Sequence, residues 1–183
     1  MTSQQRERIL QALWLQPGPP AAAVWAILDC ARDPQIYRAL LASQLEFRCL
    51  YAGRLPRELE MVAPQLVELS PGNRLALQWL DQGWGQSWGV LLRIDDPANL
   101  RHHLRKFLKV RDPQGLTLLF RYYDPRVLRA FLPAADAGQR KALFGPIAHW
   151  FTEDDHDGLQ GFGLDAQGGL LRTRLVAASP QPA

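Results

Sequence analysis

Cysteine and long apolar runs are the features that this sequence most clearly lacks. Its 183 residues include only two cysteines, Cys30 and Cys49, and no apolar run approaches the roughly 20 residues that span a bilayer. Residues 1–20 also lack the basic-then-apolar order and the small-residue cleavage site of a signal peptide. We therefore expect a cytoplasmic protein with two free thiols packed in its core.

Motifs for common cofactors and metals are missing as well. The sequence contains neither a dinucleotide-binding fingerprint nor a P-loop. The acidic stretch 154–158 lacks the spacing and the distal Glu of a calcium loop, and His102 and His103 are adjacent, so they diverge on a helix. We expect no cofactor and no metal site, with 154–158 forming a turn between strands.

Positive charge is present but is not concentrated. The formal net charge is +3 and the isoelectric point is near 9.1, with arginines scattered along the whole chain. Nucleic-acid-binding proteins usually gather such charge on one face, interleaved with aromatic side chains. The densest group, at 101–111, is either a solvated helix face or a patch for an acidic partner. A weak basic nucleic-acid-binding module remains an alternative interpretation.

The periodicity of the apolar residues indicates a mixed α/β fold. With 47% apolar residues the chain can bury one core without a disulfide or a metal. Strand, helix and strand over 24–51 predict a right-handed parallel crossover. The predicted strands are 24–28, 47–51 and 88–94, and the predicted helices begin near Asp33-Pro34, Gly72-Asn73 and Asp96-Pro97.

Four regions are expected along the chain. Residues 1–20 form an amphipathic helix and a Pro/Gly linker, 21–151 an α/β domain in which strands and helices alternate, 152–177 a small antiparallel β meander, and 178–183 a flexible tail. The first helix either docks on the body or is offered to a partner. Its apolar face carries Ile9, Leu10, Leu13 and Trp14.

Residues 107–132 predict three elements in succession. Two apolar runs flank the tetrapeptide 112–115, which has Pro and Gly where a type I turn prefers them, so a hairpin is expected. The second strand, 116–123, leads into Asp124 and Pro125, which can cap and begin a helix. One buried face of this helix is expected to carry Val127, Leu128, Phe131 and Leu132, and Pro133 ends it.

Arg121 lies in this otherwise apolar second strand and needs water or a carboxylate. Asp124 is close enough in sequence to be its partner while it also caps the helix. A structural ion pair and a recognition site are both open interpretations. The tryptophans Trp84 and Trp88 are likewise either core residues or parts of a binding surface.

Ser87 supports an enzymatic alternative. It lies in a Gly-x-Ser-x-Gly sequence, and Asp124 and His149 follow it in the order of an α/β hydrolase triad. The motif needs a strand before the serine and a helix after it. Here a helix is expected before Ser87 and a strand after it, which disfavours a nucleophile.

Several segments together resemble the adaptor or effector-chaperone family of bacterial type VI secretion systems. The central one reads LRHHLRKFLKVRDPQGLTLLFRYYDPRVLRAFL, at 100–132. The resemblance extends over roughly residues 24–151, through the order and spacing of further segments. These are 24–43, 47–69, 79–92 and 144–151.

The resemblance implies a non-enzymatic protein of the bacterial cytoplasm. Members of the family bind a cognate effector, a toxin, and load it onto the spike-tip protein VgrG. No nucleic acid and no membrane are implied as partners, and no cofactor or metal is implied. The residues that we expect to contact a partner are Arg105, Arg121, Tyr122, Tyr123, Asp124, Arg126, Trp84 and Trp88.

Overall fold

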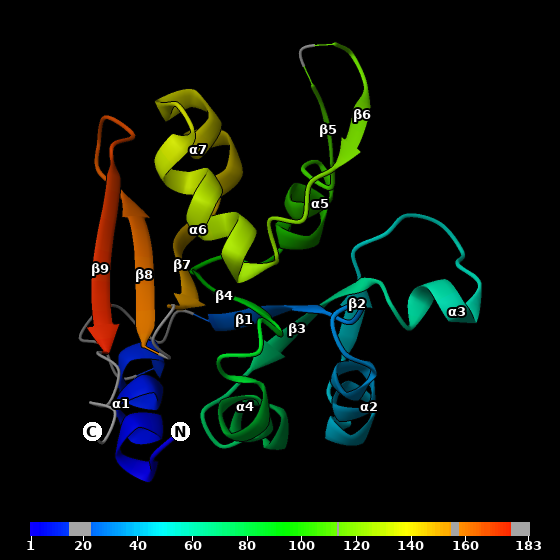
Figure 1. Ribbon diagram of the computed structural model, residues 1–183, viewed down its shortest axis with the longest axis vertical. Helices are drawn as coiled ribbons and strands as arrows, with labels where there is room; N and C mark the ends of the chain where they lie inside the picture. The colour runs from blue at the N-terminus through cyan, green and yellow to red at the C-terminus, as the bar shows by residue number, and fades with distance from the viewer. Residues whose placement is uncertain (15–22, 113, 155–157, 177–183) are drawn as a thin grey trace, which may run out of the picture.

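A seven-stranded sheet forms the centre of the computed structural model, which describes residues 1–14, 23–112, 114–154 and 158–176 (Figure 1). Its strand order is β2-β3-β1-β4-β7-β8-β9, and all neighbours are antiparallel. The linker expected before residue 21, the tail at 178–183 and residues 155–157 of the acidic stretch lie outside the described residues. The strands are β1 (Ala23–Asp29), β2 (Phe47–Cys49), β3 (Pro64–Leu69), β4 (Gly89–Ile94), β7 (Ile147–Glu153), β8 (Leu159–Leu164) and β9 (Leu170–Val176).

Helices cover both faces of this sheet, so the mixed α/β class is confirmed. Helices α1, α2 and α4 lie on one face, and α5, α6 and α7 lie on the other (Figure 1). The helices are α1 (Ser3–Trp14), α2 (Pro34–Ser43), α3 (Arg57–Glu60), α4 (Arg74–Gln78) with a π-helical turn η1 (Trp79–Gly83), α5 (Leu100–Arg105), α6 (Pro125–Ala134) and α7 (Ala137–Phe144).

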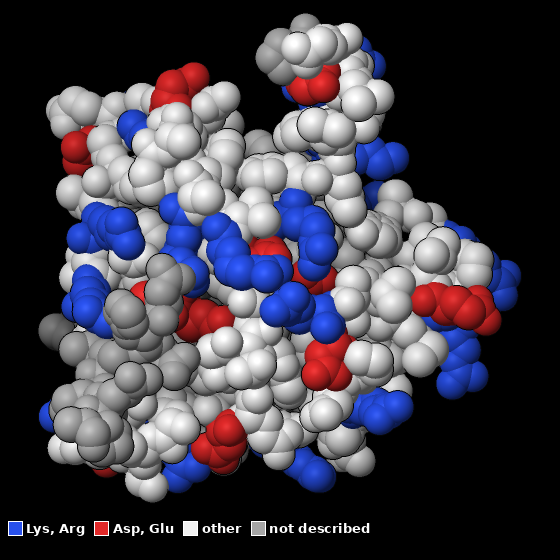
Figure 2. All heavy atoms as spheres, in the orientation of Figure 1, with Lys and Arg blue, Asp and Glu red and all other residues white. Residues whose placement is uncertain are grey.

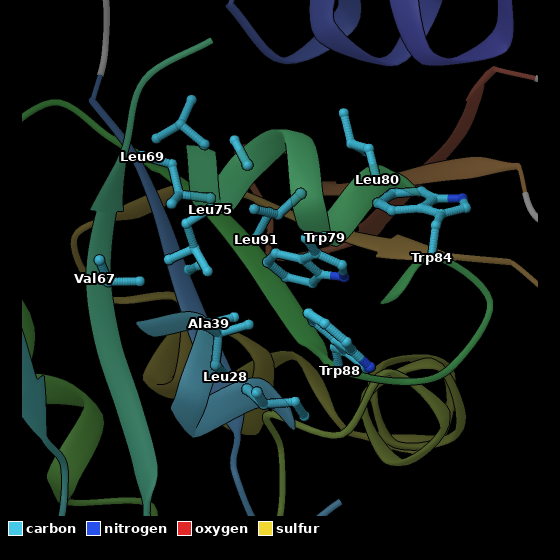
Figure 3. Packing of buried hydrophobic residues seen from close by; sticks show 14 of the residues in the cluster. Leu28, Ala39, Val67, Leu69, Leu75, Trp79, Leu80, Trp84, Trp88 and Leu91 are labelled. Carbon is cyan, nitrogen blue, oxygen red and sulfur yellow. The ribbon is translucent and has the colours of Figure 1, made fainter. Parts of the chain in front are cut away.

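Two hydrophobic cores result from this layering. Alternate residues of β1 enter different cores: Ala26 and Leu28 pack under α2 and α4, whereas Ile27 packs under the helices of the opposite face. Figure 3 shows the first core, in which Leu91 of the sheet lies close to Trp79, and Leu28 lies nearer to Ala39 and Trp88. Burial on both faces explains why these strands read as apolar runs rather than as alternating ones.

The expected parallel crossover is not formed. β3 lies between β1 and β2 and is antiparallel to both, so β1 and β2 run in the same direction without being neighbours. The sequence analysis missed β3 because five of its six residues are buried and the polar-apolar alternation is lost. The three C-terminal strands form the expected meander, and β7 pairs with β4 in the same sheet.

Helix α1 is docked on the body. Ile9 and Leu13 are fully buried in the first core, as their spacing predicts. Arg93 of β4 donates to the carbonyl oxygens of Ala12 (3.0 Å) and Leu13 (2.5 Å), which have no partners inside the helix. The C-terminal end of α1 is therefore fixed to the sheet.

The predicted hairpin forms a separate two-stranded sheet. Strand β5 (Lys109–Arg111) pairs with β6 (Thr117–Leu119), and Gly115 at the turn has a positive φ of 85°. The second strand is shorter than expected, because it ends at Leu119 rather than at Tyr123. Figure 1 shows this hairpin projecting beyond the rest of the molecule.

Capping residues set most of the helix starts. Asp33 and Asp124 cap α2 and α6 as predicted, and Asn73 caps α4. Asp96 instead accepts from the amide of Ala98, and α5 begins later, at Leu100. Helix α7 was not anticipated, although Asp136 and Gln139 form a capping box that is readable in the sequence.

Candidate functional site

Three buried carboxylates gather where β1 and β7 end and α6 begins. Asp29 is the last residue of β1, Glu153 is the last residue of β7, and Asp124 caps α6. β1 and β7 are both antiparallel to β4, so their C-terminal ends lie at the same edge of the sheet. All three side chains are buried, and each has arginines around it.

Asp29 is the ion-pair partner of Arg121. Arg121 Nη2 donates to Asp29 Oδ2, and this hydrogen bond raises the pKa of the guanidinium. The prediction that Asp124 is the ion-pair partner of Arg121 is therefore wrong. After Phe120, residues 121–124 form a turn in which the amide of Asp124 donates to the carbonyl oxygen of Arg121, and the side chain of Arg121 reaches Asp29 from this turn. Asp29 Oδ1 is buried and accepts no hydrogen bond from the described residues.

Asp124 binds Arg126 in a two-point geometry while it caps α6. Its Oδ1 accepts from the amide and Nε of Arg126, each at 3.0 Å, and its Oδ2 accepts from Nη2 at 2.6 Å. Burial alone would raise the pKa of Asp124, but the hydrogen bonds from Arg126 outweigh it and lower the pKa. The predicted cap is confirmed. The positive charge of Arg126 lies in the first turn of α6, where its interaction with the helix dipole is unfavourable, and its ion pair with Asp124 offsets this.

Glu153 fastens the loop between η1 and β4. Its carboxylate accepts from the amides of Gly85 and Ser87, both at 2.7 Å, and from Ser87 Oγ at 3.3 Å. Burial raises the pKa of Glu153 despite these hydrogen bonds and the nearby charge of Arg129. Arg129 Nη1 also donates to the main-chain oxygen of Glu153, at 2.6 Å.

The hydrolase triad is not assembled around Ser87. The hydroxyl of Ser87 is hydrogen-bonded to Glu153, and the side chain is buried. His149 pairs with Arg93 near the far end of β4, whereas Ser87 precedes the start of that strand. Asp124 is occupied by Arg126. Ser87 has a positive φ of 58°, and both its amide and its hydroxyl donate to Glu153.

All four aromatic residues expected at a partner surface lie in the cores. Tyr122 is fully buried and donates to the carbonyl oxygen of Leu104 at 2.9 Å, and Tyr123 is buried next to it. Trp84 and Trp88 belong to the first core (Figure 3). These four side chains therefore contact the protein interior, the two tyrosines in the second core and the two tryptophans in the first.

The arginines of the expected site remain accessible to different degrees. Arg121 and Arg126 reach the surface beside their carboxylates, and Arg105 is half-buried on α5, outside this cluster. Figure 2 shows lysines and arginines gathered across the middle of one face, with carboxylates between them. The structure therefore brings together Arg121, Asp124 and Arg126, and adds Asp29 and Glu153, which the sequence analysis missed.

An apolar groove adjoins this cluster and was also missed. It is shallow and wide open, it lies along α6 beside Phe120, and its lining is mostly apolar apart from Asp124 and Arg126. Phe120, which follows β6 directly, forms one side of it and packs against Phe131 of α6. Four apolar residues flank Thr117 in the sequence, at 116 and at 118–120. They were the signal that could have indicated an exposed apolar surface here. The apolar lining residues are Phe120, Val127, Ala130 and Phe131.

The described part of the chain offers no evident metal centre. Within those ranges, no group of three or more His, Cys, Asp or Glu side chains is placed to share an ion. Both cysteines are free, and burial raises the pKa of the Cys30 thiol. Among the described helices, none has the length and apolarity required to cross a membrane.

Comparison with known proteins identifies a family rather than an individual relative. Neither the curated proteins nor the solved structures include a match to this chain. One family model, described as a domain of unknown function (DUF4123), matches residues 24–142. The matched region runs from β1 to α7 and includes the hairpin, the groove, Asp29 and Asp124. Since the match covers more than half of the sequence, the chain belongs to the DUF4123 family.

Proposed function

We propose that this chain is a non-enzymatic adaptor that acts in the bacterial cytoplasm. It binds a cognate effector of a type VI secretion system and recruits that effector to the VgrG spike-tip protein. The observation that carries the proposal is the projecting hairpin beside an open apolar groove. Exposed apolar surface of this kind, rimmed by charges, is typical of protein interaction sites.

Two further observations support binding rather than catalysis. The buried carboxylates are used internally, by Arg121, by Arg126 and by the loop at Ser87. The family match covers the segments whose sequences resemble the secretion adaptors, apart from 144–151. An adaptor needs two partner surfaces, one for the effector and one for the spike tip, and the arginine-rich face and the hairpin are separate candidates (Figure 2).

Co-expression tests this proposal directly. The chain is produced with the toxin encoded beside its own gene, inactivated in its catalytic residues, and with the VgrG protein of the same gene cluster. We expect the chain and the toxin to co-elute in size-exclusion chromatography, and VgrG to join them. A toxin from an unrelated secretion cluster is the control. Separate elution of the chain from both neighbouring gene products would contradict the proposal.

A further inference from the structure

Helix α1 covers an apolar surface that the family-matched region contributes. The family model begins at residue 24, so α1 lies outside the match, whereas the surface beneath it comes from β3, from β4 and from the segment 76–84 inside the match. We call it the α1-covered surface, and Figure 3 shows most of its side chains. They are Leu69, Ala76, Trp79, Leu80, Trp84 and Leu91.

Two polar contacts fit this surface to a helix of one direction. In the first half of α1, Arg6 Nη1 donates to Asp81 Oδ1 at 2.9 Å. At the other end, Arg93 donates to carbonyl oxygens of the last turn, which lack partners at any helix C-terminus. Arg6, Ile9 and Leu13 follow one another at helical spacing on the same side of α1. The α1-covered surface therefore fits a helix that has a basic residue, an apolar residue three positions later and another four positions after that.

The fit of α1 to this surface is incomplete. A gap of about 10 Å³ remains beside Leu13 and Trp14, and all of its lining residues are hydrophobic. The atoms around such a gap lose dispersion contacts on one side. Only Gln5, Ile9 and Leu13 of the helix are buried, and the pair of Arg6 with Asp81 is partly exposed and adds little stability. Few contacts therefore hold α1 in place.

A helix other than α1 can make better use of this surface. Trp79 and Trp84 are buried with α1 in place, and tryptophans in apolar surroundings contribute strongly to binding at protein interfaces. The α1 of a second copy would leave the same gap and would lose the advantage of being tethered. A partner helix with a larger apolar residue at the place of Leu13 would fill the gap.

We propose that α1 is an autoinhibitory helix, and that an amphipathic helix of the effector replaces it on the α1-covered surface. The incoming helix carries Arg or Lys at the place of Arg6, an apolar residue at the place of Ile9, and Phe or Met at the place of Leu13. Its last carbonyl oxygens accept from Arg93. While α1 is docked, it lowers the apparent affinity for this helix by the fraction of molecules that it leaves open. This inference rests on the proposed adaptor function.

Two labelled peptides test the chemistry of the surface without the effector. Both have the sequence of residues 1–14 with Leu13→Phe, and the second also has Arg6→Glu. Fluorescence anisotropy with the full chain should give about tenfold tighter binding of the first peptide, because Glu at the place of Arg6 faces Asp81. In the Asp81→Arg chain this preference should reverse. Equal affinity of the two peptides for both chains would overturn the placement on this surface.

Variants of α1 itself distinguish a displaceable cover from a fixed element. Ile9→Asp weakens the docking of α1 and leaves the α1-covered surface unchanged, so the first peptide should bind about tenfold more tightly. Arg6→Glu removes only the partly exposed ion pair, which keeps the chain folded, and should tighten binding about threefold. Arg8→Glu makes the same charge change at an exposed position of α1 and is the matched control, with no effect expected. Binding to Arg6→Glu that is no tighter than binding to Arg8→Glu would overturn the autoinhibition.

The co-elution experiment separates this inference from the proposed function. If Arg6→Glu retains more toxin at limiting concentration than the wild type and Arg8→Glu do, both stand. If all three retain the toxin equally, the adaptor function stands and the toxin does not use this surface. Failure of the toxin to co-elute with any of them contradicts the adaptor function, while the peptide measurements still decide whether α1 is displaceable.

Hydrogen exchange gives an independent readout of the displacement. The amides of α1 should lose their protection when the toxin binds, because the helix leaves the sheet and an isolated helix of this length is marginal in water. Protection of α1 that persists in the toxin complex would overturn the inference and leave the adaptor function intact.

Discussion

Buried carboxylates hold the arginines of the candidate site in place. An ionised side chain removed from water needs a charged or hydrogen-bonded partner, because its desolvation costs several kcal/mol. Asp29 satisfies one oxygen with Arg121, Asp124 satisfies both with Arg126, and Glu153 uses main-chain amides. Each carboxylate therefore fixes a neighbouring loop or side chain.

Arg121→Met should destabilise the protein, since it leaves the carboxylate of Asp29 buried and unpaired. Removing one partner of a fully buried pair costs about 3 to 5 kcal/mol, but the side chain of Arg121 is 39% exposed and water can partly replace it. We expect a loss of about 2 kcal/mol in the free energy of unfolding, measured by urea denaturation. Adding Asp29→Asn should recover part of this loss, and an unchanged Arg121→Met protein would contradict the pairing.

Asp124→Ala should destabilise the protein more than Arg126→Ala does. The first change removes both the cap of α6 and the partner of Arg126, and a cap alone is worth about 1 kcal/mol. The second leaves Asp124 hydrogen-bonded to the main chain and should cost less than about 1 kcal/mol, because Arg126 is half-exposed. Thermal melts of both variants and of Asp124→Asn, which keeps a capping side chain, measure the difference. The reverse order would contradict the assignment of Asp124 as both the cap of α6 and the partner of Arg126.

The two shifted carboxyl pKa values should act on stability in opposite directions. The pKa of Glu153 is raised, so the folded state holds a proton that the unfolded state releases, and stability falls as pH rises from the ordinary glutamate range through the raised value. The pKa of Asp124 is lowered, so its contribution is complete above the ordinary aspartate range and is lost as pH falls through the folded value.

Glu153→Gln should therefore flatten the pH dependence of stability above the ordinary glutamate pKa. We expect its melting temperature to decline less than that of the wild type as pH rises above the ordinary glutamate range. Asp124→Asn is the control, because its effect should appear at lower pH. Parallel melting curves for Glu153→Gln and the wild type across this range would show that Glu153 is not protonated in the folded state.

At the scale of elements, helix α1 covers part of the first core, although its residues precede the region that the family model matches. Deletion of residues 1–14 exposes the surface under Ile9 and Leu13 and should cost about 1 to 3 kcal/mol, which lowers the melting temperature by several degrees. Arg93→Met tests the contribution of the two hydrogen bonds to the helix end by itself. An unchanged melting temperature after the deletion would mean that α1 is not docked in solution.

The elements that were predictable from the sequence are those with local signals. Asp33 and Asp124 cap their helices through atoms only two residues away, and Gly115 supplies the positive φ of its turn. β3 and the early end of β6 were not predictable in this way. Their extent depends on which strands lie beside them in the sheet, and no nearby residue specifies that.

At the scale of the whole molecule, β7 joins both cores. Phe151 belongs to the first core and Trp150 to the second, and α6 and α7 pack against this strand. The family match ends at residue 142, before β7 begins. A fragment that stops there lacks one neighbour of β4 and part of each core.

We therefore expect a fragment of residues 24–142 not to fold on its own. Its amide proton spectrum should show the narrow dispersion of an unfolded chain, whereas the full chain should unfold in a single transition. Coincident urea curves from tryptophan fluorescence and far-ultraviolet circular dichroism measure that cooperativity. A well-dispersed spectrum from the fragment would show that the matched region is an independent domain.

The sequence by itself determined the α/β class, the hairpin, the caps of α2, α4 and α6, and the amphipathic face of α1, because each depends on residues close together in the chain. Only the tertiary structure decided the site. Arg121 meets Asp29 across 92 residues, and Ser87 meets Glu153 across 66. Such pairs are set by the order of strands in the sheet and by the point at which β6 ends. Local propensity does not encode either of these, since both follow from the burial of surfaces that distant segments share.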